Sequence, residues 1–237
     1  MTTARNTGDE RGARQAATRG ASGKARLDRE AIIAAGLELA AAPGASSISV
    51  RELGASLGAD PTAIYRHFRS KEHLMQALLD ELITRSLVRV TADPADWQDR
   101  ILQLAQATLD LFAEYPAVGV EAVVLTTHGP GELDVIELML DAFSRAGLSG
   151  EDVVRHYALL ASHMLSSAAG IARSRSQHEA PPNGSSPWFE GPLLADPRTH
   201  PLIASFAVDI AELEDVDLYL LGVRAVIRSA ERTALGH

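Results

Sequence analysis

Residues 49–71 read SVRELGASLGADPTAIYRHFRSK, and this segment predicts two short helices joined by a tight turn. Val50, Leu53 and Leu57 recur at helical spacing, so they form one apolar stripe on the first helix. Gly58 follows that stripe and is suited to end the helix, because glycine readily adopts the left-handed backbone of a helix stop. The first helix is therefore expected over Ile48–Gly58.

The second helix is predicted over Pro61–Phe68. Asp60 is a suitable N-cap, and Pro61 occupies the first helical position, where its missing N–H costs nothing. Ile64 and Phe68, four residues apart, give this helix its buried side. The side chains left outside are small, basic or able to hydrogen-bond: Thr62, Ala63, Tyr65, Arg66, His67 and Arg69. Two short helices with a glycine-containing turn form a helix-turn-helix, whose second helix enters the DNA major groove.

Further helices flank this motif and complete a known pattern. A first helix is expected over Leu27–Ala42, with Asp28 as its cap, and a fourth begins at Ser70-Lys71-Glu72-His73-Leu74. Together with the helix-turn-helix, this arrangement resembles the DNA-binding domain of the tetracycline-repressor-type (TetR) family of regulators. The resemblance implies an all-α fold, with an N-terminal three-helix DNA-binding domain containing the helix-turn-helix and a larger helical domain for ligand binding and dimerisation.

The residues expected at the DNA follow from the motif and the resemblance. Arg51, Thr62, Ala63, Tyr65 and His67 are predicted to read bases, while Ser49, Arg66 and Lys71 hold phosphates. Lys71 opposes the dipole of its own helix, unless a phosphate sits at that helix end. It is therefore either an ordinary solvated lysine or a phosphate contact, and the neighbouring motif favours contact.

Charge is unevenly distributed along the chain. The net charge is −9, yet residues 1–26 hold six basic and two acidic side chains. Residues 27–73 hold five basic and six acidic side chains, and residues 74–237 hold 11 basic and 23 acidic side chains. Three segments follow: a disordered basic arm (1–26), a DNA-binding domain (27–73) and an effector-binding and dimerisation domain (74–237). The arm is either a floppy terminus or a contact to the DNA backbone or minor groove.

Composition excludes several classes of protein. The absence of cysteine excludes disulfides and thiolate metal sites and suits a reducing cytoplasm. No apolar run reaches about 18 residues, and no apolar segment follows the N-terminal arginines, so a soluble cytoplasmic protein without membrane contact is expected. The histidine spacings match no helical zinc site, and no nucleophile elbow, P-loop or dinucleotide fingerprint occurs. Neither an enzyme nor a metal protein is predicted.

The chain beyond Asp93 is predicted to be a series of helices. Their expected ranges are Asp96–Tyr115, Val118–Thr127, Leu133–Arg145, Glu151–Ala172, Leu202–Glu212 and Val216–Thr233, with a turn at 128–131 and a long loop over Arg173–Pro201 anchored by Trp188 and Phe189. The helices Glu151–Ala172 and Val216–Thr233 are apolar or small on more than one side. Pairing both with their copies would form a four-helix interface, so a homodimer through 151–172 and 216–233 is expected, as the family resemblance also implies.

A small-molecule effector is expected to bind among these helices. The candidate lining residues are Phe112, Tyr115, His128, Met139, Phe143, His163 and Met164, with Trp188 and Phe189 from the long loop. Each could instead be ordinary core. His163 is either a pocket residue or a satisfied interior histidine, and His128 either touches ligand or is simply exposed.

The second half is most similar to the tetracycline-repressor subgroup, at Asp96–Asp99, Ala146–Ser149 and Leu220–Val223. That subgroup holds its drug with magnesium through a histidine, but His128 lies too far along its segment to match. Tetracycline–metal binding is therefore not expected, and no cofactor is predicted.

The function predicted from the sequence is a ligand-responsive transcriptional regulator. As a dimer it would bind palindromic double-stranded operator DNA, and a small-molecule effector would release it. Repression rests on the family resemblance alone. The alternative is a helical small-molecule-binding or interaction protein whose DNA-binding head is inactive.

Overall fold

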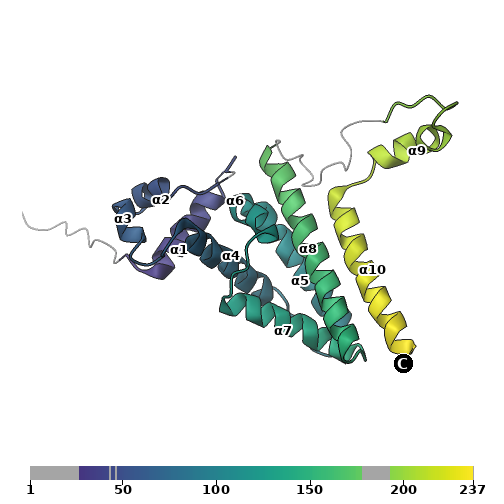
Figure 1. Cartoon of the computed structure of the whole chain (residues 1–237), viewed down its shortest axis with the longest axis horizontal. Coiled ribbons are helices and arrows are strands. Elements are labelled where there is room, and N and C mark those ends of the chain that lie inside the picture. The colour runs from purple at the N-terminus through teal and green to yellow at the C-terminus, as the bar shows by residue number, and fades with distance from the viewer. Residues whose placement is uncertain (1–26, 43, 46, 178–192, 237) are drawn as a thin grey trace, which may run out of the picture.

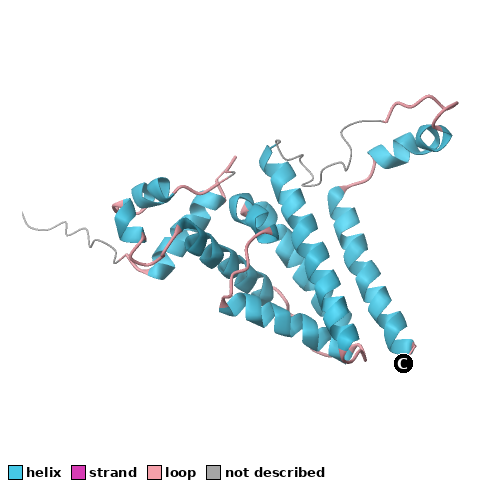
Figure 2. Cartoon of the chain, in the orientation of Figure 1, coloured by secondary structure: helices cyan, strands magenta, loops and turns pink. Residues whose placement is uncertain are grey.

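The computed structural model describes residues 27–42, 44–45, 47–177 and 193–236, and over these ranges the regular elements are all helices (Figures 1 and 2). The predicted arm, Trp188 and Phe189 lie outside the described residues. The elements are α1 (Arg29–Ala40), α2 (Val50–Ser56), α3 (Pro61–Ile64), α4 (Lys71–Val88), α5 (Trp97–Glu114), α6 (Pro116–Gly119), the 3₁₀ helix η1 (Val120–Val123), α7 (Pro130–Arg145), α8 (Glu151–Gln177), α9 (Pro201–Ala211) and α10 (Asp215–Leu235).

Predicted side-chain caps begin the helices of the N-terminal head, which consists of α1, α2 and α3. Asp28 accepts a hydrogen bond from the Ala31 N–H at 2.9 Å, and Asp60 accepts one from the Thr62 N–H at 2.8 Å. Ser70 accepts from the His73 N–H at 3.0 Å at the start of α4. Each bond satisfies an amide that the helix itself leaves without a partner, so these local signals fix where the helices begin.

The turn between α2 and α3 is held by backbone geometry. Gly58 has a φ of +59°, which confirms its predicted role as a helix stop. Gly54 brings the two helices close, because a Cβ at this position would lie 2.9 Å from the carbonyl oxygen of Ala59. Leu53, Ile64 and Phe68 are buried beneath the turn, and they form the head's part of a hydrophobic core that continues into the body.

Helix α4 connects the head to the larger body. Its N-terminal part packs against α1, and the rest packs against α5, α6 and α7 (Figure 1). The boundary between the DNA-binding domain and the larger domain, predicted between residues 73 and 74, stays a prediction. It falls within this continuous helix. Displacement of α4 within the body would therefore be carried to the head.

Helices α8 and α10 lie side by side along one edge of the body, whereas α9 stands away from it (Figure 1). Tyr219 anchors α10, because its buried hydroxyl donates a 2.9 Å hydrogen bond to the Ala105 carbonyl of α5. Burial raises the pKa of Tyr219, so the hydroxyl keeps the proton that it donates. No residue of α9 is buried.

Tyr219→Phe is expected to lower the free energy of unfolding by about 1–2 kcal/mol, because α10 loses its buried hydrogen bond to α5. For a chain of this size that corresponds to a fall in Tm of about 2–8 °C in thermal denaturation. Tyr65→Phe is the control, because Tyr65 is 48% exposed and loss of its hydroxyl group should leave Tm unchanged. Equal Tm values for the two variants would contradict the anchoring role.

Several predicted boundaries are wrong. The helix predicted over Val118–Thr127 is replaced by α6, η1 and a non-helical stretch over 124–129, because β-branched residues fit a continuing helix poorly. The turn predicted at 128–131 ends earlier, since Pro130 occupies the first position of α7.

Two other boundaries also shift. Regular helix α3 ends at Ile64 rather than Phe68, and a tighter turn follows in which the His67 N–H donates to the Ile64 carbonyl at 2.9 Å. The first five residues of the predicted loop after Ala172 instead continue α8 to Gln177.

Candidate functional site

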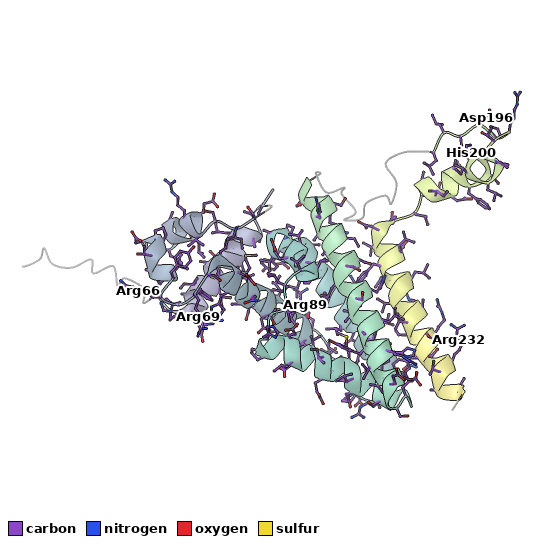
Figure 3. All side chains as sticks on the ribbon, in the orientation of Figure 1. Arg66, Arg69, Arg89, Asp196, His200 and Arg232 are labelled. Atoms are coloured by element: carbon purple, nitrogen blue, oxygen red, sulfur yellow. The ribbon has the colours of Figure 1, made fainter. Side chains whose placement is uncertain are left out.

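The surface of the head around α3 carries exposed basic side chains that are not held in ion pairs within the described residues. Arg51, Arg66 and Lys71 are exposed, and none of them forms an ion pair with a residue that the structure describes. Residues 61–71 contain no acidic side chain. Arg66 and Arg69 lie at the end of the molecule far from α10 (Figure 3). This surface therefore presents free guanidinium and ammonium groups, which suit phosphate oxygens.

Thr62 is held at the start of α3 by two hydrogen bonds to Asp60. Its hydroxyl donates to Asp60 at 2.6 Å, while its backbone N–H donates to the same carboxylate oxygen at 2.8 Å. These two bonds hold the pKa of Asp60 below its usual value, with the hydroxyl bond contributing most. Because its proton is engaged, the exposed Thr62 hydroxyl presents only lone pairs to an incoming partner, and the side chain also presents a methyl group.

The remaining predicted DNA residues lie on the same part of the head. Tyr65 is 48% exposed, and Ala63 and His67 are partly buried. Ser49 caps α2 through a long 3.5 Å contact with the Glu52 N–H. Arg29 was not predicted at this surface, because it occupies no position of the motif. Its guanidinium lies 4.6 Å from the centre of the Phe68 ring, so packing between α1 and the end of the helix-turn-helix adds a further cation to the head.

The described part of the body contains an inner cavity and an outer groove. The smaller, which we call the inner cavity, has a volume of about 80 Å³ and lies between α4, α5, α7 and α8. It is lined by Ile83, Ser86, Thr108, Phe112, Glu132, Val135, Ile136, Met139, Tyr157, Ala161, Met164 and Leu165. The larger, the outer groove, has a volume of about 760 Å³ and lies between α8 and the start of α10.

The predicted pocket residues do not line one common cavity. Phe112, Met139 and Met164 line the inner cavity, and His163 lines the outer groove. The other three predicted residues, Tyr115, His128 and Phe143, line neither hollow.

These three residues have other surroundings. Tyr115 accepts a 3.3 Å hydrogen bond from the Arg85 guanidinium, and burial is the main cause that raises its pKa. Phe143 is fully buried against Trp97 and His156. His128 is exposed, with a φ of +53°.

His163 has the contacts of a satisfied interior histidine. Its Nε2 lies 2.9 Å from the Tyr219 carbonyl oxygen and therefore donates, while Nδ1 faces the Ser167 hydroxyl at 3.4 Å. A Cβ on Gly222 would collide with the imidazole ring, so α10 approaches α8 closely here. These contacts give His163 a role in joining α8 to α10.

A hydrogen-bonded connection between α4 and the start of α7 was not predicted. The Asp80 carboxylate of α4 accepts from the Gly131 N–H at 3.2 Å, the Glu132 N–H at 3.0 Å and the Thr127 hydroxyl at 2.8 Å. We call this set the Asp80 junction. A residue 51 positions earlier in the chain thus caps α7, taking the place of a local cap.

The Asp80 junction requires a glycine in α7 and touches the inner cavity. A Cβ at Gly131 would lie 2.6 Å from the Asp80 carbonyl oxygen, so the two helices meet where only glycine fits. Glu132, the next residue, lines the inner cavity. The junction therefore connects one wall of the cavity to the helix that carries the head.

Metal-binding and membrane-spanning features do not occur in the part of the chain that the structure describes. Within these ranges, no group of three or more His, Cys, Asp and Glu side chains has an arrangement able to hold a metal ion. None of the described helices has the length and apolar character needed to cross a membrane.

Comparison with known proteins agrees with the geometry. Residues 32–78 match the model for bacterial regulatory proteins of the tetR family, and residues 91–218 match that for the tetracyclin repressor-like C-terminal domain. A helix-turn-helix-type transcriptional repressor of Mycobacterium tuberculosis is 28% identical over 184 residues, covering 75% of this chain and 69% of the relative. The class D tetracycline repressor protein of Escherichia coli is 27% identical over 210 residues, covering 87% of this chain and 90% of the relative.

Among solved structures, a putative transcriptional regulator from Streptomyces coelicolor superimposes with a TM-score of 0.71 at 26% identity, covering 88% of this chain and 98% of that one. The all-α fold and the family predicted from the helix-turn-helix are confirmed. With a C-terminal family model spanning more than half of its length and the DNA-binding model matching the head, the chain belongs to the TetR family of transcriptional regulators.

Proposed function

We propose that this regulator is a homodimeric repressor that binds a palindromic operator and is released when a small effector enters the inner cavity. The observation that carries the proposal is the position of α4. This helix holds the head at one end, lines the inner cavity with Ile83 and Ser86, and is bonded to α7 through Asp80. Cavity and head thus share one element.

Operator binding would use the basic surface of the head. Arg66 and Lys71 would hold phosphates along with Ser49, and Arg51, Thr62 and Tyr65 would reach base edges with Ala63 and His67. The absence of ion pairs at Arg51, Arg66 and Lys71 among described residues supports this assignment, because no intramolecular bond has to be broken before DNA is contacted.

Dimerisation would bury the outer sides of α8 and α10. Exposed apolar side chains occur on both helices, at Val154, Leu159 and Leu221. Small residues recur every four positions along α8, at Ala158, Ser162, Ser166 and Gly170, which permits close approach of a second helix. Helix α9, whose exposed Leu202 and Phe206 have no cover within the described chain, adds further apolar surface for a partner. A two-fold dimer would place two heads on two half-sites.

Effector release would follow from linkage. A volume of about 80 Å³ is small beside the roughly 300–1,000 Å³ of typical ligand pockets, so binding requires the walls to move apart. Met139 and Met164 are suited to this, because unbranched thioether side chains repack easily. If the widened state places the heads at an unsuitable spacing, the effector lowers operator affinity by the ratio of its affinities for the two states.

The test is binding of the purified protein to DNA flanking its own gene, measured by fluorescence anisotropy across a salt series. We expect selective binding with two chains per palindromic site and an affinity that falls steeply with salt. A random duplex of equal length and composition is the control. The proposal would be contradicted if a folded dimer bound every duplex from the DNA around its gene no more tightly than the random duplex. That result would favour the alternative of an inactive head.

A further inference from the structure

We propose that the inner cavity selects an amphiphilic organic cation: an apolar, preferably aromatic body carrying a protonated amine that pairs with Glu132. This inference deepens the proposed function, on which it rests for the role of the ligand as an effector. The cavity wall consists mainly of aliphatic, aromatic and thioether side chains, with Ser86, Thr108, Tyr157 and Glu132 as its polar members. The chemistry of these polar groups decides the class of ligand.

Two hydroxyls of the cavity can offer only lone pairs. Ser86 donates its proton to the Ile83 carbonyl at 2.7 Å, and Thr108 donates its proton to the Leu104 carbonyl at 2.8 Å. Both side chains are buried, and a hydroxyl has a single proton to give. Toward a ligand, each is therefore a hydrogen-bond acceptor, and a ligand group that also only accepts would leave it unpaired.

Glu132 adds a third acceptor, and this one is charged. Its Oε2 accepts from the His128 N–H at 2.6 Å, whereas the Thr127 hydroxyl lies 3.2 Å away and is closer to Asp80, at 2.8 Å. Glu132 forms no ion pair with any residue in the described ranges. The cavity lining contains no lysine, arginine or histidine. A cation from outside is the missing partner for a carboxylate beside an apolar space.

The rest of the wall suits the body of such a ligand. Phe112 and Tyr157 present aromatic rings, whose faces attract cations, and Met139 and Met164 provide polarisable surface that adapts to shape. Apart from the Tyr157 hydroxyl, the polar side chains of the lining act only as acceptors, so an anion would meet a negative charge with a single side-chain donor of the lining to offset it. A neutral hydrocarbon would gain burial but leave Glu132 without a counter-charge. A carboxylate and two accepting hydroxyls in an aromatic and thioether wall therefore favour the cation.

A pair of isosteric probes tests the proposal. Protonated cumylamine (2-phenylpropan-2-amine) and tert-butylbenzene differ only in the replacement of a methyl group by an ammonium group. Titrated into the full-length protein at neutral pH and followed by calorimetry, the cation should bind at least about 10-fold more tightly than the hydrocarbon, as expected for a charge-assisted hydrogen bond. Glu132→Gln should abolish this preference, whereas Glu137→Gln, a change in the same helix at a residue outside the cavity lining, should keep it.

Tighter binding of tert-butylbenzene, or an unchanged preference in Glu132→Gln, would overturn the proposal. Ala161→Phe, which fills the cavity, should abolish binding of the cation; binding that survives this change would place the site elsewhere and also overturn it. Operator binding of each variant is measured separately without probe, which shows that the variant is folded. If the cation binds through Glu132 but leaves operator affinity unchanged, the ligand class stands and the effector role in the proposed function fails.

Discussion

Arg51→Ala combined with Lys71→Ala is expected to weaken operator binding by about 100-fold or more while leaving the fold intact. Both side chains are exposed and form no ion pair with described residues, so their removal costs the head little stability. A base contact contributes about 1–3 kcal/mol, and each phosphate that is no longer neutralised also reduces counterion release. In a dimer the double change removes four side chains from the complex.

The measurement is operator affinity over a salt series, together with circular dichroism and sedimentation. The slope of log K against log salt should become shallower, by roughly one unit for each phosphate that the variant leaves without a cationic partner. Arg198→Ala combined with Arg232→Ala is the matched control, because it removes the same charge at exposed positions away from the head (Figure 3 labels Arg232, and it labels Asp196 and His200 on either side of Arg198 in the sequence). Equal weakening in the two double variants would reduce the effect to net charge and refute the assigned contacts.

The helix starts of the head could be predicted because their causes are local. Asp28, Asp60 and Ser70 each bond to an amide two or three residues ahead, so the determining atoms lie within one turn of sequence. The start of α7 has Pro130 as a local signal but no side-chain cap from its N-cap residue, Gly129, and its amides are bonded by Asp80 on α4. The sequence pattern predicts a turn there, and only the packing of α4 against α7 reveals that Pro130 already begins the helix.

The proposed effector site was only partly predictable for a related reason. Helical spacing identifies Phe112, Met139 and Met164 as inward-facing, and these residues do line one cavity. The same spacing does not separate a cavity wall from filled core, so it also selects Phe143, which is enclosed by other side chains. Glu132 is charged, so a search for apolar residues at helical spacing does not select it. Its importance comes from lying beside both the cavity and the Asp80 junction, which is a property of the fold.

Asp80→Ala is expected to lower the free energy of unfolding by about 2–3 kcal/mol and Tm by about 4–12 °C, because two amides and one hydroxyl lose a charged acceptor. The destabilisation should be local. Amide hydrogen exchange should rise most at Gly131 and Glu132, whereas the core of the head beneath the α2–α3 turn should keep its protection, because the Asp80 carboxylate bonds to the start of α7 and not to the head.

Asp80→Asn should fall between the wild type and Asp80→Ala, since an amide retains one acceptor oxygen but no charge. Glu81→Ala is the neighbouring control, because Glu81 pairs with Arg85 on a partly exposed face of α4, and such pairs contribute about 0.3–0.5 kcal/mol. If Asp80→Ala destabilised no more than Glu81→Ala, α7 would not depend on α4 for its cap. A further outcome is faster exchange confined to the start of α7 together with operator binding that persists without effector. In that case the hydrogen bonds of Asp80 to α7 would form the bond through which movement of the cavity wall reaches α4. Without that bond, the head would still bind DNA but would no longer respond to the effector.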